Sequence, residues 1–291
     1  MQFPYGPPYD ICKPACVRVI EGRYAARARE DAAAPAPLVG FTLLYPTWSS
    51  MSLKPRYTLN DLYVAPGARR GGVGRALLRA SVDHARAAGA AEIFLRTGVA
   101  NAAAQALYAS EGWARVDDFV YYVKKFGADR GDATAAAAAP AAPPAAVRVY
   151  RVDAGACAAV APLFEEYRSW RFPAPEASAS YLRARVGAGD AVAFAAAPTG
   201  GGVAGFTLLY PTWGSGAMRP RYTLNDLYVA PGARRGGVGR ALLRAGVDHA
   251  RAAGAAEIFL RTGVANAAAQ ALYASEGWAR VDDFVYFVIK L

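Results

Sequence analysis

Cysteine and histidine are scarce in this sequence. The 291 residues include three cysteines and two histidines. Three cysteines are too few for a disulfide scaffold, and one of them is necessarily unpaired. Cys12 and Cys16 have a spacing that suits half of a metal site, but no second Cys/His pair stands at ligand spacing. We therefore expect free thiols and no bound metal.

Long apolar runs and a secretion signal are missing as well. No run of about 18 consecutive apolar residues occurs, so a membrane-spanning helix is not expected. Residues 1–10 are rich in Pro and Tyr and show no basic segment followed by an apolar one. These features predict a cytoplasmic protein with no membrane partner.

Composition and charge narrow the class further. With 54% hydrophobic and 19% charged residues, the chain is too apolar to be wholly disordered. Its length suits about two domains. The net charge is +10, and 28 of the 33 basic residues are arginine. Such an excess suits an anionic ligand such as a nucleic acid, a membrane surface or a nucleotide phosphate. A simple bias toward Ala and Arg explains it equally well.

One segment of the chain is written twice. Residues 40–125 align with residues 205–290 at a constant offset of 165, and 78 of the 86 positions are identical. The differences fall at positions 49, 51, 52, 53, 54, 81, 122 and 124 of the first copy. This period is too long for a solenoid, so each copy is expected to form most of one globular domain.

Composition also places the domain boundaries. Residues 127–145 are rich in Ala and Pro and lack apolar periodicity, which is typical of a linker. We therefore predict an N-terminal domain over 1–126, a linker over 127–145 and a C-terminal domain over 146–291. The second copy is preceded by 57 residues, 146–202, whereas the first has only 1–39 and no counterpart of the first long helix expected there. The N-terminal domain is expected to be truncated at its front.

Apolar periodicity predicts alternating strands and helices in the second half. Strands are expected over 147–152, 191–195, 203–209, 221–229, 257–262 and 285–289, and helices over 157–170, 176–186, 239–253 and 267–275. Tyr210 to Trp213 are expected to close the third strand, with a surface loop over 214–220. Strand, tight turn, helix and strand in succession imply parallel strands with a right-handed crossover. The predicted fold class is α/β, or α+β with a mixed sheet.

A glycine-rich turn carries the first candidate site. It runs from Val229 to Arg240, is matched by 64–75, and joins a predicted strand to a predicted helix. Its glycines let backbone N–H groups converge, and the helix N-terminus adds partial positive charge. Arginines such as Arg234 and Arg235 add full charges, so the turn suits a pyrophosphate. It lacks the Lys-Ser/Thr of a Walker loop and the third glycine of a dinucleotide fingerprint. A glycine-rich helix entry with solvated arginines is the alternative.

A second motif lies on the following predicted helix. It begins at Asn266 and includes Tyr273, with Asn101 and Tyr108 as the matching residues of the first copy. Asn266 suits a helix N-cap. Tyr273 follows about two turns later and so lies on the same helix face. The alternative for Tyr273 is a half-buried aromatic residue without a chemical role.

Together the two motifs resemble the GNAT superfamily of acyl-CoA-dependent N-acetyltransferases. Arg234-x-x-Gly237-x-Gly239 is similar to the family's Arg/Gln-x-x-Gly-x-Gly/Ala pyrophosphate loop. Asn266-x-x-Ala269-x-x-Leu272-Tyr273-x-x-x-Gly277-aromatic is similar to its later helix motif. The resemblance covers 146–291 fully and 17–126 partly. It implies two tandem GNAT-like domains, each with a central mixed sheet, a splayed pair of parallel strands and flanking helices.

The resemblance also implies the reaction and the roles of individual residues. The reaction is direct transfer of an acetyl group from acetyl-CoA to an amine. Tyr273 and Tyr108 would protonate the departing thiolate, and Asn266 and Asn101 would position the cofactor arm. Main-chain groups would hold pantetheine and polarise the thioester just before the loop, and bind the pyrophosphate within it. These residues are Leu227, Tyr228, Val229, Arg234, Arg235, Gly236, Gly237, Val238, Gly239 and Arg240, and in the first copy Leu62, Tyr63, Val64, Arg69, Arg70, Gly71, Gly72, Val73, Gly74 and Arg75.

The general base is assigned from the strand before the loop. Residues 224–229 resemble the Leu-Glu-Asp-aromatic strand of polyamine and thialysine N-acetyltransferases, but Asn225 stands where those enzymes have glutamate. This departure leaves Asp226, and Asp61 in the first copy, as the base or amine anchor. Successive strand residues face opposite ways, so Asn225 and Asp226 face one pocket only if a bulge intervenes. A strand-edge aspartate paired with an arginine is the alternative.

The predicted function is N-acetylation of a primary amine on a small molecule such as a polyamine or an amino acid. Acetylation of protein or histone lysines is an alternative, and a non-catalytic CoA-binding regulator is another. A nucleic-acid-binding module is not favoured, because no motif for it is present. The two copies are expected to pack as an internal pseudo-dimer, or the chain to form a homodimer. His84 and His249 are interpreted as structural, and Tyr210 as either pocket lining or core.

Overall fold

The computed structural model describes residues 15–16, 39–127, 147–169 and 173–291, and these form two compact units. The C-terminal unit contains Ser49–Leu53 and Asp118–Asp282. The N-terminal unit contains Lys54–Asp117, Asp283–Leu291 and the described residues among 10–48. The expected linker, apart from residue 127, and most of the expected truncated front lie outside the described residues. None of the described helices is long and apolar enough to cross a membrane.

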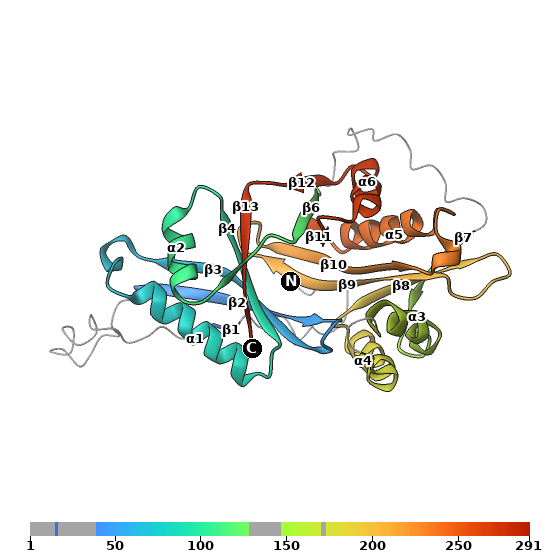
Figure 1. The fold of residues 1–291 in the computed structure, drawn as a ribbon, viewed down its shortest axis with the longest axis horizontal. Coiled ribbons are helices and arrows are strands. Elements are labelled where there is room, and N and C mark those ends of the chain that lie inside the picture. The colour runs from blue at the N-terminus through green and yellow to red at the C-terminus, as the bar shows by residue number, and fades with distance from the viewer. Residues whose placement is uncertain (1–14, 17–38, 128–146, 170–172) are drawn as a thin grey trace, which may run out of the picture. The chain divides into compact units, whose positions relative to one another are not determined.

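The C-terminal unit is built on a mixed sheet of seven strands. In spatial order they are β12 (Ala279–Val281), β6 (Phe119–Lys125), β11 (Glu257–Gly263), β10 (Arg219–Val229), β9 (Gly205–Gly214), β8 (Val192–Pro198) and β7 (Val147–Val152). Only β10 and β11 are parallel among these pairs. Helices α5 (Val238–Ala252) and α6 (Ala267–Ser275) lie on one side of the sheet, and α3 (Cys157–Ser169) and α4 (Pro175–Gly187) on the other (Figure 1). The expected α/β class with a mixed sheet is confirmed.

The N-terminal unit repeats the central part of this arrangement. Its described strands are, in order, β1 (Ala15–Cys16), β2 (Gly40–Ser49), β3 (Lys54–Val64), β4 (Glu92–Gly98), β13 (Phe284–Lys290) and β5 (Ala114–Val116). Its described α-helices are α1 (Val73–Ala87) and α2 (Ala102–Ser110). Strands β3 and β4 are parallel, as β10 and β11 are in the other unit.

The long strand near the end of each copy lies in the sheet that the other copy mainly forms. Strand β6 pairs with β11 from Phe119 opposite Gly263 to Lys125 opposite Glu257. Strand β13 pairs with β4 in the equivalent register. The copies are almost identical in sequence, so each strand fits either sheet. Only residues 117–118 join β5 to β6, and only residues 282–283 join β12 to β13; short connections of this kind favour exchange of an element.

Most expected elements are present, with two corrections in the second half. The third strand does not close at Tyr210, because β9 continues through Pro211 to Gly214. Proline is tolerated there because the pairing of β9 with β8 ends at Leu209, so Pro211 has lost its neighbour on that side. The expected surface loop is correspondingly shorter and β10 begins at Arg219. The short strand β12 has no counterpart among the expected elements.

The hydrophobic core of the C-terminal unit lies between α5 and the sheet. Leu243 and Val247 of α5 pack with Leu209, Leu224 and Ile258 of three neighbouring strands, and Leu209, Leu243 and Ile258 are fully buried. Helix α5 is amphipathic, with its apolar residues at helical spacing on the buried face. This packing holds the N-terminus of α5 against the end of β10, where the glycine-rich turn lies.

Candidate active site

The two parallel strands of the C-terminal unit separate toward the glycine-rich turn. The recorded pairing of β10 with β11 runs from Arg221 opposite Glu257 to Thr223 opposite Phe259. Strand β10 continues to Val229, where it remains paired with β9. The edge of residues 224–229 that faces β11 therefore offers main-chain groups outside the ladder. This is where the predicted pantetheine-binding residues lie, and β3 and β4 have the same arrangement.

The turn itself presents the start of α5. Arg235 and Gly237 have positive φ values of 61° and 83°, and Gly237 is the N-cap of the helix. The first N–H groups of a helix have no partner within the helix, so those after Gly237 are free to bind an anion. Arg70 and Gly72 repeat this conformation in the first copy, with φ values of 66° and 85°.

The arginines of the turn differ in their surroundings. The Nε of Arg234 donates to the carbonyl oxygen of Val229 at 3.0 Å, which holds the turn against the end of β10. Arg240 forms an ion pair with Glu276 at 2.8 Å. Arg235 is exposed. A hydrogen bond to a carbonyl oxygen leaves the charge of Arg234 in place, so the positive charge at this turn comes from Arg234, Arg235 and the helix N-terminus, whereas Glu276 offsets that of Arg240.

Asn266 is the N-cap of α6, as predicted. Its side chain accepts a hydrogen bond from the backbone N–H of Ala269 at 3.2 Å. Gln270, one turn later, donates to the carbonyl oxygens of Gly263 and Val264 at 3.3 and 2.8 Å. These bonds fix the loop between β11 and α6, so the helix begins at the same point in both copies. A role of Asn266 in positioning a cofactor stays a prediction.

Tyr273 is buried at the core of the C-terminal unit with 6% of its surface exposed. Its ring packs against Tyr122 and Trp278, with centroids 5.5 and 6.1 Å away. Burial, and to a lesser extent Tyr122, raises the pKa of Tyr273 to about 12. Tyr108 has an equivalent place beside Phe287, where burial also raises its pKa. Both phenols are therefore protonated at neutral pH, as a proton donor must be.

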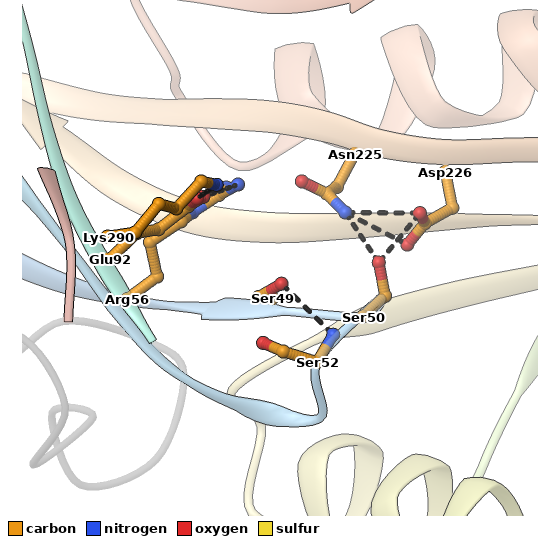
Figure 2. A network of polar contacts seen from close by, with 8 residues as sticks. All are labelled: Ser49, Ser50, Ser52, Arg56, Glu92, Asn225, Asp226 and Lys290. Carbon is orange, nitrogen blue, oxygen red and sulfur yellow. Dashed lines mark hydrogen bonds and ion pairs between the residues drawn. The ribbon is translucent and has the colours of Figure 1, made fainter. Parts of the chain in front are cut away.

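Strand β10 has a register shift between Leu224 and Asp226, so the bulge that the sequence analysis required is present. The Nδ2 of Asn225 lies 3.1 Å from both carboxylate oxygens of Asp226, so the two side chains point the same way (Figure 2). The Oγ of Ser50 donates to the Asp226 carboxylate at 2.7 Å. Tyr167 also forms a hydrogen bond with it. Asp226 is 1% exposed, and such a buried carboxylate needs these donors.

Ser50 reaches Asp226 because a buried arginine holds its loop. Arg168, 2% exposed, donates from Nε to the carbonyl oxygen of Ser50 at 3.2 Å and from Nη2 to that of Met51 at 2.9 Å. Its Nη1 donates to Ser178 at 2.8 Å and pairs with Glu165 at 3.2 Å. Sequence reasoning missed this network, because Ser50 is more than 100 residues from both Arg168 and Asp226 in the sequence. The one feature of the sequence that points to this network is that the residues around Ser50 differ between the two copies.

The less favoured candidates, His249 and Tyr210, pack against other side chains of the C-terminal unit. His249 packs edge-on against Tyr222 and Phe194, with centroids 5.4 and 5.9 Å away. Burial, with a smaller contribution from Arg151, lowers the pKa of His249. Tyr210 is 1% exposed and its hydroxyl lies 2.8 Å from that of Tyr181. Tyr210 is therefore part of the core.

Comparison with known proteins gives a consistent result. The model of the acetyltransferase (GNAT) family matches residues 4–113 and 159–278. An uncharacterised N-acetyltransferase, YhfO, of Bacillus subtilis strain 168 is 38% identical over 136 residues, which are 46% of this chain and 91% of that protein. The streptothricin acetyltransferase of Streptomyces lavendulae is 37% identical over 91 residues, which are 31% of this chain and 46% of that enzyme.

The fold also matches a solved tandem structure. A tandem GNAT protein from the clavulanic acid biosynthesis pathway aligns with a TM-score of 0.55 at 22% identity, covering 88% of this chain and 80% of that one. Both halves of the chain therefore have a GNAT fold, and the two matched segments belong to two separate copies of the domain. The chain belongs to the GNAT family of acetyltransferases, with two copies of the family's domain in tandem.

Proposed function

We propose that this chain transfers the acetyl group of acetyl-CoA to the primary amine of a small molecule, and that the C-terminal unit performs most of the turnover. The observation that carries the proposal is the bulge in β10, which turns Asn225 and Asp226 to the same side beside the gap between β10 and β11. The expected donor site and a buried carboxylate thus meet on one strand. The likeness to streptothricin acetyltransferase supports a small acceptor.

The residues of the turn fit a diphosphate. A Cβ placed on Gly239 would lie in van der Waals contact with Val229 and Leu272, at 3.6 and 3.7 Å, so the helix start lies close to the strand and to α6. Gly237 adopts the left-handed conformation that the turn requires. In this proposal, the N–H groups from Arg234 to Arg240 bind the pyrophosphate of acetyl-CoA.

The reaction follows from these positions. The amine loses a proton to Asp226 and attacks the thioester carbonyl, whose oxygen is stabilised by a main-chain N–H of β10. The new C–N bond forms as the C–S bond breaks. Tyr273 gives its proton to the departing thiolate, and the nitrogen of the new amide gives up its second proton, which restores the phenol of Tyr273. Asp226 acts in the same proposal as the anchor that orients the ammonium form before the proton is lost.

The test is thiol release by the full chain with acetyl-CoA and a panel of amines. The panel contains polyamines, because residues 224–229 resemble a strand of polyamine N-acetyltransferases. It also contains amino acids, aminoglycosides, streptothricin and a histone-tail peptide. We expect turnover with one class of small amine, and a fall in kcat of about a hundredfold or more for Tyr273→Phe. Tyr108→Phe, the matched change in the first copy, is expected to lower kcat much less. The product is identified by mass spectrometry.

Other outcomes assign other functions. Preference for the peptide would make the chain a protein acetyltransferase. Binding of acetyl-CoA without turnover would favour a regulatory role.

Because the pKa of Tyr273 is raised to about 12, its ionisation is expected to leave the rate profile unchanged below pH 10. The stability that depends on the protonated phenol is present below pH 10 and is lost as the pH rises through 12.

A further inference from the structure

Two of the eight differences between the copies lie in the exchanged strands. Tyr122 and Lys124 of β6 correspond to Phe287 and Ile289 of β13. Strand β6 lies between β11 and β12 in the C-terminal sheet. Tyr122 and Lys124 therefore belong to the first copy in sequence but to the second in structure. The exchange therefore places different side chains beside α6 in the C-terminal unit and beside its counterpart α2 in the N-terminal unit.

Both side chains contact α6 near its C-terminal end. The Tyr122 ring packs on Tyr273 with an angle of 55° between the ring planes, and Tyr122 is 5% exposed. The Nζ of Lys124 donates to the carbonyl oxygen of Glu276 at 2.6 Å. Glu276 is the C-cap of α6, where orphan carbonyls and the helix dipole favour a cation. Tyr273 is thus held from its ring and from the end of its helix.

The N-terminal unit lacks this pair of groups. Phe287 packs on Tyr108 at the same 5.5 Å separation but has no hydroxyl. Ile289 has no ammonium to reach the end of α2, and it lines a surface hollow of about 400 Å³ together with Glu111, Gly112 and Trp113. The hollow leaves room for a longer side chain at this position. The helix that carries Tyr108 therefore has weaker support than the one that carries Tyr273.

We infer that Tyr122 and Lys124 are positioning residues for Tyr273, supplied by the first copy, and that they make the C-terminal site the faster of the two. The inference rests on the proposed function, and it explains why two nearly identical copies would differ in their rate of turnover. Tyr122 acts through its ring, which packs on Tyr273, and through the hydroxyl that Phe287 lacks. Lys124 acts by holding the end of α6 against β6.

The test exchanges the two pairs in the full chain. The first variant is Tyr122→Phe with Lys124→Ile, in a Tyr108→Phe background so that the C-terminal site alone reports. Thiol release is measured with acetyl-CoA and the best amine of the panel, and acetyl-CoA affinity by calorimetry. We expect kcat to fall about threefold to tenfold, because the variant removes the hydroxyl of Tyr122 and the hydrogen bond from the Lys124 ammonium to α6, with the Kd for acetyl-CoA unchanged.

The reciprocal variant is Phe287→Tyr with Ile289→Lys in a Tyr273→Phe background. Here we expect kcat of the N-terminal site to rise by a similar factor. Lys125→Ile, an exposed neighbour on β6, is the control for loss of charge and is expected to have no effect. A structural role alone would lower the unfolding temperature and leave kcat unchanged in both directions, which would overturn the inference. A parent chain without turnover would overturn the proposed function and the inference together.

Discussion

At the scale of the residue, Asp226 is the most constrained group of the candidate site. It combines near-complete burial with hydrogen bonds from Ser50, Asn225 and Tyr167. The same donors that stabilise the carboxylate also occupy much of its surface. A proton received from an amine would therefore displace one of these donors, and the hydroxyls of Ser50 and Tyr167 are suited to passing a proton on. In the proposed reaction this carboxylate is the base, and the alternative is that it only holds Ser50, Asn225 and Tyr167 in place.

Substitution of Asp226 by Asn separates these two roles. The change keeps the shape but removes the charge, so we expect kcat to fall about a hundredfold or more and the acidic limb of the pH profile to flatten. Asp61→Asn, at the matching position of the first copy, is expected to change kcat by less than about twofold, because the C-terminal unit is proposed to dominate turnover. The measurement is kcat from pH 5 to 9, with thermal unfolding as a control. A parental pH profile with a lowered unfolding temperature would make Asp226 structural.

At the scale of the element, the contact between β9 and α5 controls the geometry of the glycine-rich turn. Gly205 pairs with Val229, and a Cβ placed on it would lie 2.7 Å from the carbonyl oxygen of Tyr228 and 3.1 Å from Val238 and Leu242. The absence of a side chain lets the first turn of α5 approach the sheet. The position of the helix start, and of the proposed anion site, depends on this close approach.

Gly205→Ala is expected to destabilise the C-terminal unit by about 1–3 kcal/mol, because backbone must move to admit the methyl group. Acetyl-CoA affinity should fall as well, since β10 and α5 both shift. Gly246→Ala is the matched control. Its methyl group would lie 3.4–3.5 Å from Leu209 and Leu224, and Ser81 already occupies the equivalent position in α1. We expect Gly246→Ala to stabilise the helix by about 0.5–1 kcal/mol.

Urea denaturation of both variants measures these changes. Equal stabilities for Gly205→Ala and the parent would show that the strand and helix adapt without cost. They would also show that the close approach does not control the turn.

At the scale of the whole molecule, strand exchange makes the two copies depend on each other. Strand β6 fills the C-terminal sheet between β11 and β12, and β13 fills the N-terminal sheet between β4 and β5. The loop that carries Ser50 also belongs to the C-terminal unit. A fragment made of the second copy alone would lack β6, so the edge of β11 that pairs with β6 would be unpaired. Asp226 would also lose the hydrogen bond from Ser50.

A fragment over 146–291 is therefore expected to form a dimer. Its β13 closely resembles the missing β6, so two fragments can exchange these strands and complete both sheets. We expect light scattering to give about twice the monomer mass and the amine acetylation rate to fall well below that of the full chain. A fragment over 146–283, which lacks β13, is the control and should not form a folded dimer. A monomeric 146–291 fragment with full activity would contradict the prediction.

Much of the fold, including the conformation of the glycine-rich turn and the start of α6, could be predicted locally. Periodicity places α6 at its observed bounds and β7 likewise, because their apolar spacing and caps are contained in the segment itself. The repeat and the motifs at Arg234 and Asn266 identify the family for the same reason. Those signals are contiguous, and the backbone N–H groups of a turn and helix start depend little on distant residues.

The remaining features depend on contacts between distant residues. Almost identical strands at 119–125 and 284–290 satisfy either sheet, so local pattern does not specify which one each joins. Asp226 is a candidate from its sequence neighbours, but Ser50 and Arg168 reach it only in the folded chain. The sequence alone determined the tandem GNAT domains, the glycine-rich turn and the capped helix that follows it. The tertiary structure decided the exchanged strands, the network around Asp226 and the environment of Tyr273, because these depend on long-range packing that no local pattern encodes.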